Sequence, residues 1–375
     1  MCTSSNCTHD DRHHPLLIFD GGTGREIEAQ GGPFRQPEWS ALSLYEAPHV
    51  VQQVHENFLN AGAEGITTNA YAIVPFHIGE QRYRSDAHNH LLPLSVDLAQ
   101  KAIKNDQSVA VDEDSTNNKK MVIGSIPPLC GSYEPEKFDP KVAGPILDDF
   151  LNAYLNGGSG THSAAADVLL LETIGSIEEA KFYLEGIHKR FAKCSSVPIW
   201  LSFCVKSENG MDQTPKLLTS ETLTQAIKEL SQSNLLDHAE VVMVNCCDVR
   251  VVKDAIVELK EALSATENNN GFSRRHRRLG AYPNAFSIPP PDAANHTLRQ
   301  VDYNITPQVF RDYAREWMNA GASVIGGCCG IGPNHIAALQ ELKVEEGKSS
   351  GIGPSHVASL QNLKDEDDKK AKTAR

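Results

Sequence analysis

Two pairs of adjacent cysteines have the side chains and the positions needed to bind a metal. The first pair is Cys246-Cys247 and the second is Cys328-Cys329, and each directly follows a short apolar run with strand character. Thiols at the ends of two separate strands can converge in space, and three thiolates that meet form a site for a soft metal, foremost zinc. A site with three protein ligands leaves one position open for a substrate, which favours a catalytic role.

Three thiolates also select the chemistry. Zinc held by three thiolates carries a formal charge of about −1, which makes it a weak activator of water but a good holder of a fourth thiolate. A substrate thiol bound there loses its proton, and the thiolate is the nucleophilic form of sulfur. Alkylation yields a thioether, which is a much poorer ligand and can leave. The cysteines therefore predict alkyl transfer to a thiol.

Eight short apolar runs that alternate with helical stretches must position these cysteines. Strands buried on both faces of a parallel sheet have this near-continuous apolar character. Eight such units in a row predict a single-domain (β/α)8 TIM barrel, an α/β fold, and an open doubly wound sheet is the alternative. The expected strands are 16–20, 64–69, 121–126, 167–172, 198–205, 240–246, 279–284 and 323–328. The expected helices are 48–60, 86–104, 139–156, 176–191, 220–233, 249–263, 306–319 and 333–343.

Several of these helices have clear start and stop signals. Thr306 precedes Pro307, which suits the first helical turn, and Ser176 with Glu179 forms a capping-box pattern. Gly62 and Gly321 each stand at the expected end of a helix, directly before a strand.

Polar residues close most of the expected strands, and in a barrel the active site lies at that end. Asp20 and Glu172 are carboxylates that could bind an ammonium group. The loop Gly21-Gly22-Thr23-Gly24 follows the first strand, and its amides could accept a carboxylate, which makes Thr23 a candidate substrate-binding residue. This set suits an amino acid that carries a thiol. The other residues at expected strand ends are Asn69, Ser125, Cys246, Asn284 and Cys328.

Composition excludes several other classes of protein. The net charge of −13 argues against a nucleic-acid partner. No run of about 18 apolar residues is present, so we expect no membrane span. The N-terminus has neither the basic nor the apolar part of a secretory signal, and nine cysteines with vicinal pairs do not resemble a secreted disulfide framework. These features predict a cytoplasmic protein.

The chain divides into three predicted parts. Residues 1–14 form a disordered N-terminus, residues 15–343 the barrel, and residues 344–375 a C-terminal extension. The extension contains a partial repeat, because the sequence of residues 330–343 recurs at residues 351–364 without a preceding strand and without cysteines. We interpret this second copy as a non-catalytic appendage.

The sequence resembles the homocysteine S-methyltransferases, which include the zinc-dependent betaine and S-methylmethionine enzymes. The resemblance extends from about residue 16 to residue 343 and implies a (β/α)8 barrel. It rests on Asp20-Gly21-Gly22, residues 61–71, Gly124-Ser125-Ile126-Pro127-Pro128, Leu170-Leu171-Glu172-Thr173, Val244-Asn245-Cys246, Tyr282-Pro283-Asn284 and Gly326-Gly327-Cys328-Cys329.

The resemblance implies a role for most of the candidate residues. It implies that Zn²⁺ is held by Cys246, Cys328 and Cys329, and that Asp20 and Glu172 contact the amino group of homocysteine. Cys247 is additional to the family pattern, and we favour Cys246 as the ligand because it follows Asn245. The implied reaction is methyl transfer from a sulfonium or other onium donor to homocysteine, which gives methionine.

The donor is less clearly indicated than the acceptor. Thr173 stands where the betaine branch has a tyrosine, and Tyr282-Pro283-Asn284 resembles the branch that uses S-methylmethionine or S-adenosylmethionine. These two donors are therefore favoured. The sequence does not indicate an oligomeric state.

Two alternatives remain at this point. The acceptor could be a related thiol or selenol such as selenocysteine. The cysteines could instead form a metal or redox sensor with a vicinal Cys328-Cys329 disulfide, although a sensor has no need for an acidic rim. A purely structural zinc site would require a fourth protein ligand, and no further Cys or His presents itself at a fixed spacing.

Overall fold

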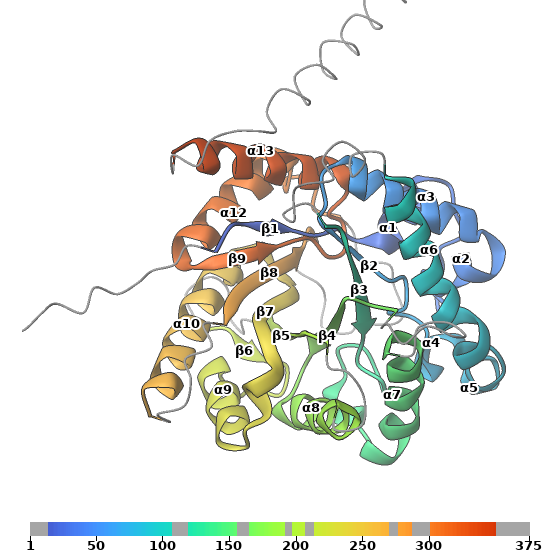
Figure 1. Cartoon of the computed structure of the whole chain (residues 1–375), viewed down its shortest axis with the longest axis horizontal. Coiled ribbons are helices and arrows are strands. Elements are labelled where there is room, and N and C mark those ends of the chain that lie inside the picture. Colours follow the sequence, from blue (N-terminus) through green and yellow to red (C-terminus); the bar gives the residue numbers. More distant parts are fainter. Residues whose placement is uncertain are drawn as a thin grey trace, which may run out of the picture.

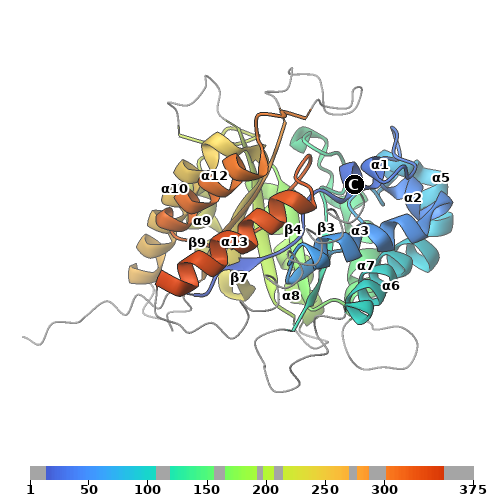
Figure 2. The same ribbon diagram turned by 90° about the horizontal axis from the view of Figure 1, so that it is seen from above.

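The strands form a parallel barrel surrounded by helices (Figures 1 and 2). This computed structural model describes residues 14–106, 119–155, 165–191, 197–206, 214–269, 277–286 and 301–349. The order around the sheet is β1-β9-β8-β7-β5-β4-β3-β2, which confirms the predicted (β/α)8 TIM barrel. The strands are β1 (Leu17–Ile18), β2 (Gly65–Thr67), β3 (Met121–Ile126), β4 (Val168–Ile174), β5 (Ile199–Lys206), β7 (Ala239–Asp248), β8 (Arg278–Asn284) and β9 (Ala322–Ile325).

The first and second strands meet over only a few residues. Phe19 and Gly65 form a parallel bridge, the Glu64 amide donates to the Ile18 carbonyl at 2.7 Å, and the Asp20 amide donates to the Gly65 carbonyl at 3.2 Å. These bonds complete the ring and place Asp20 directly beside β2. A two-residue strand that the sequence did not predict, β6 (Lys216–Leu217), pairs antiparallel with β5 outside the ring.

One long helix follows each barrel strand, close to where the sequence places it. The observed helices are α3 (Pro48–Asn60), α6 (Leu92–Asn105), α7 (Pro140–Leu155), α8 (Ile177–Phe191), α9 (Leu223–Gln232), α10 (Val252–Asn269), α12 (Pro307–Ala320) and α13 (Pro333–Ser349). The shorter helices α1 (Thr23–Ala29), α2 (Ala41–Glu46), α4 (Pro75–Ile78) and α5 (Glu80–Arg82) lie in the loops after β1 and β2 and were not predicted.

Three predicted helix limits are corrected by the structure. The helix predicted over 86–104 is a π-helix at Tyr83–Leu91 followed by α6, because Pro93 cannot donate a hydrogen bond to the preceding turn. Helix α9 begins after Thr222 rather than at Ser220, since Thr222 and Gln225 form a capping box. Helix α13 continues to Ser349, so the predicted domain limit at residue 343 falls inside it.

The predicted caps are present. The Val309 amide donates to Thr306 Oγ1 at 3.3 Å, and the Glu179 amide donates to Ser176 Oγ at 3.1 Å. Gly62 and Gly321 have φ angles of 100° and 122°, which residues with a side chain rarely adopt. These two glycines end α3 and α12.

A separate apolar cluster fills the inside of the barrel. We call it the barrel plug, and its aromatic members pack edge to face, with the Phe19 ring 5.8 Å from Trp200 and 5.1 Å from Tyr282. A larger apolar layer lies between the strands and the helices. The barrel plug consists of Phe19, Ile123, Val168, Leu170, Trp200, Val241, Met243, Tyr282 and Val324. It forms a packed floor beneath the C-terminal ends of the strands.

Several predictions lie outside the described residues. These are the N-terminus up to residue 13, the second copy of the C-terminal repeat, and most of the loops at 106–120 and 287–304. Among the helices that the structure describes, none has both the length and the apolar character required to cross a bilayer.

Candidate active site

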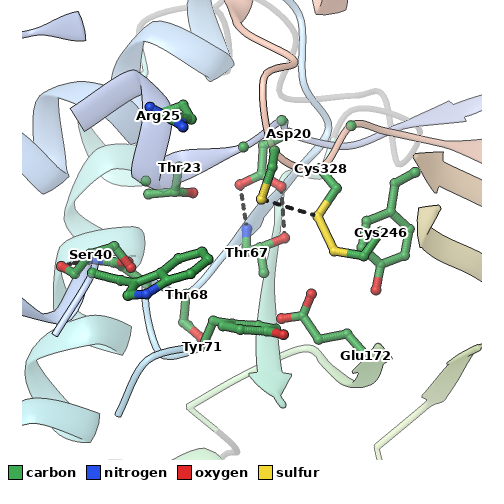
Figure 3. A pocket seen from close by; sticks show the side chains of 18 of the residues that line it. Asp20, Thr23, Arg25, Ser40, Thr67, Thr68, Tyr71, Glu172, Cys246 and Cys328 are labelled. Atoms are coloured by element: carbon green, nitrogen blue, oxygen red, sulfur yellow. Dashed lines mark hydrogen bonds between the residues drawn. A yellow bond between two sulfur atoms is a disulfide. The ribbon is translucent and has the colours of Figure 1, made fainter. Parts of the chain in front are cut away.

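A cavity lies above the barrel plug, at the C-terminal ends of the strands. Its wall includes the six residues to which the sequence assigned metal or substrate binding, which are Asp20, Thr23, Glu172, Cys246, Cys328 and Cys329. Figure 3 shows all of these but Cys329 with labels. Loops that follow β1, β2, β3 and β9 supply most of its wall, and β4, β7 and β8 supply the remainder. The lining residues are Phe19, Asp20, Gly21, Gly22, Thr23, Gly24, Arg25, Phe34, Trp39, Ser40, Thr67, Thr68, Asn69, Tyr71, Tyr133, Glu172, Cys246, Tyr282, Phe286, Gly327, Cys328 and Cys329.

The three predicted cysteine ligands meet in this cavity. Cys246 and Cys328 form a disulfide with their Cα atoms 5.8 Å apart, and Cys328 Sγ lies 4.0 Å from Cys329 Sγ. The bond therefore joins β7 to the loop after β9, rather than the vicinal pair that the sensor hypothesis expects. With these two sulfurs joined, no group of three Cys, His, Asp or Glu side chains within the described ranges forms a metal site.

Backbone hydrogen bonds fix the segment that carries Cys328 and Cys329. The Cys328 amide donates to the Pro283 carbonyl at 2.9 Å, and the Cys329 amide donates to Asn284 Oδ1 at 3.1 Å. The loop after β1 packs closely on the other side, since a Cβ atom added at Gly22 would lie 2.5 Å from the Cys328 carbonyl oxygen. A glycine is therefore needed for this loop to approach the cysteines.

The Asn245 side chain links the strand of Cys246 to the strand of Glu172. Its Oδ1 accepts from the Thr173 amide at 2.9 Å and from Ser202 Oγ at 2.7 Å, and its Nδ2 donates to Thr173 Oγ1 at 2.9 Å. Both residues beside this link are in the left-handed region, with φ of 60° at Thr173 and 49° at Cys246. Such a conformation is unfavourable for side-chain-bearing residues, so this buried network holds two strained strand ends in place.

Asp20 is buried and tightly held. Its Oδ2 accepts from the Thr67 amide at 2.8 Å and its Oδ1 accepts from Thr67 Oγ1 at 2.7 Å. Burial raises the pKa of Asp20 to about 7, although the two bonds from Thr67 oppose this shift. The carboxylate is thus oriented by β2. No cationic side chain in the described ranges pairs with it, and an ammonium group could provide that charge.

Glu172 stands across the cavity from Asp20 with similar properties (Figure 3). Ser125 Oγ donates to its Oε1 in a short hydrogen bond. Burial raises the pKa of Glu172 to about 7, the Ser125 bond opposes the shift, and repulsion from Asp20 adds to it. Two buried carboxylates whose pKa values are both raised by burial form a site that favours a bound cation.

Two buried phenols lie beside these carboxylates. Tyr71 and Tyr282 both line the cavity, and within the part of the chain that the structure describes, neither phenol oxygen makes a hydrogen bond of good geometry. Tyr282 is nevertheless close enough to Glu172 to lower the pKa of that carboxyl group, and Tyr71 lies near Ser132 and Thr173. Buried hydroxyls that are held this loosely are suited to contact a bound molecule.

Among the described residues, Cys130, Cys204 and Cys247 are not part of the cavity wall. The side chain of Cys247 packs in the layer between strands and helices, and burial raises its pKa well above the ordinary thiol value. Cys204 is also buried, and its sulfur contacts the Cys246 carbonyl at 3.8 Å. Cys246, in contrast, lines the cavity. The remaining predicted residue, Thr23, lines the cavity from the first position of α1.

Some residues that build the site were not given a role from the sequence. Thr67 and Ser125 hold the two carboxylates, and both occur in motifs that were recognised without a role. Arg25, Phe34 and Trp39 come from the α1–α2 region, where nothing in the sequence indicated a part in the site.

Comparison with known proteins identifies the family of this chain. Residues 17–342 match the family model described as homocysteine S-methyltransferase. The chain is 27% identical to homocysteine S-methyltransferase 1 of Zea mays, over 87% of this chain and 93% of that one. It is also 27% identical to homocysteine S-methyltransferase YbgG of Bacillus subtilis (strain 168), over 87% of this chain and 94% of that one.

Two further similarities extend this result. Selenocysteine Se-methyltransferase of Brassica oleracea var. italica is 25% identical over 86% of this chain and 88% of its own length. The metallated form of the homocysteine methyltransferase MmuM from Escherichia coli shares the fold, with a TM-score of 0.63 and 22% identity, over 88% of this chain and 97% of that chain. From the match over residues 17–342, this chain belongs to the homocysteine S-methyltransferase family of enzymes.

Proposed function

We propose that this protein transfers a methyl group from an onium donor to the thiol of homocysteine and that the reaction depends on zinc. The observation that carries the proposal is the meeting of three cysteine sulfurs and two buried carboxylates in one cavity. A thiol ligand site and an ammonium site in one cavity suit the two ends of a small amino acid that carries a thiol. Because thiolates persist in a reducing compartment, we propose the cytoplasm as the location.

The three cysteines fit zinc once the Cys246–Cys328 bond is reduced. Tetrahedral zinc with Zn–S distances of about 2.3 Å places its sulfur ligands about 3.8 Å apart. The sulfurs of Cys328 and Cys329 are already 4.0 Å apart, and Cys246 on β7 is bonded to Cys328. When bound, zinc supplies a site where the thiol of homocysteine loses its proton and becomes nucleophilic.

The carboxylates bind and orient the acceptor. Asp20 and Glu172 hold the ammonium group of homocysteine, and its positive charge lowers the pKa of both carboxyl groups toward their ordinary values. The carboxylate of homocysteine extends toward Thr23 and the amides beside it, on the cavity wall formed by the loop after β1. These contacts fix the direction from which the sulfur can attack.

The aromatic wall suits a cationic donor. Trp39, Tyr71 and Tyr133 line the cavity together with Phe34 and Phe286, and ring faces attract onium groups. In the reaction the acceptor sulfur forms a bond to the methyl carbon while the donor's bond to that carbon breaks, and its electron pair stays on the donor atom. The thiol proton is released to solvent. Holding the two reactants in line supplies much of the rate.

Selenocysteine is the second candidate acceptor. The observation that favours it is the similarity to the selenocysteine Se-methyltransferase of Brassica oleracea var. italica. A selenol and an amino group on a short chain would use the same cysteines and carboxylates.

A donor panel tests the proposal. The reduced, zinc-loaded protein is given homocysteine or selenocysteine with S-methylmethionine, S-adenosylmethionine, betaine or a methyl-folate, and methylated product is measured by mass spectrometry. We expect methionine formation with a sulfonium donor, and loss of activity after zinc removal. Full activity without zinc, or no methylated product with any pair, would contradict the proposal.

A further inference from the structure

The charged groups of the cavity are separated into two regions. The lining residues with charged side chains are Asp20, Glu172 and Arg25. The two carboxylates lie near the cysteines, whereas Arg25 lies beyond Thr23, away from Glu172 and Cys246 (Figure 3). The cavity therefore has an acidic, sulfur-rich inner end and a cationic outer end.

Arg25 is held between aromatic rings. Its guanidinium carbon lies 5.7 Å from the centre of the Phe34 ring and 5.8 Å from the centre of the Phe286 ring. Its Nη1 lies 2.6 Å from Glu28 Oε2, and only 19% of the side chain is exposed. Rings that flank a guanidinium fix its plane and exclude water from its faces, which strengthens binding of a carboxylate by its planar donors.

We propose that Arg25 binds the carboxylate of the methyl donor and so selects onium donors that carry a carboxylate over those that do not. This proposal rests on the proposed function. S-methylmethionine, S-adenosylmethionine and betaine all belong to the selected class.

The separation of charge assigns Arg25 to the donor rather than to the acceptor. Homocysteine is held by its sulfur at the cysteines, by its ammonium group at Asp20 and Glu172, and by its carboxylate at Thr23 and the backbone amides beside it, so all three of its polar groups are bound without Arg25. A donor must point its cationic methyl group at that sulfur. Its carboxylate then faces outward, toward Arg25, while the reverse orientation would place the carboxylate against Asp20 and Glu172 and is unfavourable.

Glu28 competes with the donor for the same guanidinium. Because Glu28 Oε2 is 2.6 Å from Arg25 Nη1, a bound carboxylate must share or displace this ion pair. We therefore expect Glu28→Gln to lower the KM of a carboxylate-bearing donor, which is opposite to the effect of changing Arg25.

The test compares Arg25→Gln with Arg35→Gln as a matched control. Arg35 lies in the same region but outside the cavity wall, is 66% exposed, and pairs with Glu46. Each zinc-loaded variant is assayed with S-methylmethionine and with its α-carboxamide, in which an uncharged amide replaces the carboxylate. Arg25→Gln should raise the KM for S-methylmethionine about 10-fold or more, the usual range for a charged hydrogen-bonded pair. The KM for the carboxamide and for homocysteine should change less than about twofold, and Arg35→Gln should change none of them.

Three results would overturn the assignment. In the Arg25→Gln variant, these are an equal rise in the KM for both donors, a rise only in the KM for homocysteine, or an unchanged KM for S-methylmethionine. Calorimetric binding of the two sulfonium compounds keeps this test separate from the proposed function. If the wild-type protein binds S-methylmethionine, the Arg25 variant does not, and no methyl transfer is ever detected, the proposed reaction is refuted but the assignment of Arg25 as a carboxylate-binding residue stands.

Discussion

The barrel plug and the cavity above it are built on the same strands but have opposite physical character. On β4, Leu170 belongs to the plug and Glu172 to the cavity, whereas Phe19 and Tyr282 belong to both and form the boundary between them. The plug is apolar and packed, so it stabilises the fold. The cavity gathers buried carboxylates with raised pKa values and loosely held hydroxyls, which are unfavourable for stability. Stability and function therefore depend mostly on different residues along the barrel axis.

Replacing a cysteine of the cluster should have the largest effect on function. We expect Cys328→Ser to abolish zinc binding and to lower kcat/KM at least about 1000-fold, because the two cysteine sulfurs that remain are too few to hold zinc at the proposed site. The unfolding free energy of the zinc-free, reduced protein should hardly change. Metal analysis and methionine formation check this, with Cys130→Ser as a control outside the cavity. Retained activity in a metal-free Cys328→Ser protein would refute the mechanism.

A change in the plug should produce the reverse pattern. Trp200→Ala removes a buried indole that packs on Phe19, and we expect a loss of about 3–5 kcal/mol in unfolding free energy. The protein that remains folded should bind zinc with nearly wild-type affinity. Urea denaturation and zinc competition measure the two quantities separately. Loss of zinc affinity in proportion to the loss of stability would mean that plug and cavity are not independent.

Asn245 should affect both properties, because it joins the two strands that carry Cys246 and Glu172. We expect Asn245→Ala to lower the unfolding free energy by about 2–3 kcal/mol, since the Thr173 amide and Ser202 hydroxyl lose their acceptor. Zinc affinity should also fall, as the left-handed Cys246 loses its support. Ser202→Ala, which leaves the Thr173 contacts intact, serves as the milder control. Unchanged zinc affinity in Asn245→Ala would show that the network serves folding alone.

Glu172→Gln should weaken substrate binding without loss of zinc. We expect a rise of about 10-fold in the KM for homocysteine, because a neutral amide cannot pair with the ammonium group. Stability at pH 8 should be unchanged or higher, since a buried charge has been removed. Zinc analysis accompanies the kinetics, and loss of zinc from this variant would show that the role given to Glu172 is wrong.

The smallest expected effect is the dependence of binding on pH. Asp20 and Glu172 each have a pKa near 7, so both are largely protonated below that pH and cannot pair fully with an ammonium group. Affinity for norleucine, which lacks a thiol, should rise several-fold between about pH 6 and pH 8. Glu172→Gln should reduce this rise. Calorimetry across this range measures it, and a flat profile in the wild type would refute the shared ammonium site.

The same shifts have a consequence for stability of the ligand-free protein. Each carboxyl group has a folded-state pKa above its ordinary value near 4, so the folded protein holds extra protons between about pH 4 and pH 7. Their contribution to the unfolding free energy therefore decreases as the pH rises through this range.

The sequence predicted the strands better than the detail of the site. Parallel strands are apolar on both faces, and the polar residues that end them, Asp20 and Glu172, follow directly from that pattern. The bulge in β7 and the left-handed Cys246 do not, because they depend on pairing with β8 and on Asn245. The aromatic setting of Arg25 was equally hidden, since Phe286 is distant in sequence and joins Arg25 only in the folded barrel.

The most direct test of the central claim is the sulfur coordination of zinc with and without homocysteine. X-ray absorption spectroscopy of the reduced, zinc-loaded protein reports the number of sulfur ligands at about 2.3 Å. We expect three sulfurs from Cys246, Cys328 and Cys329 in the free protein and four after homocysteine is added. A coordination shell that does not gain a sulfur, or one that already holds four sulfurs in the free protein, would contradict a metal site completed by the substrate's own sulfur.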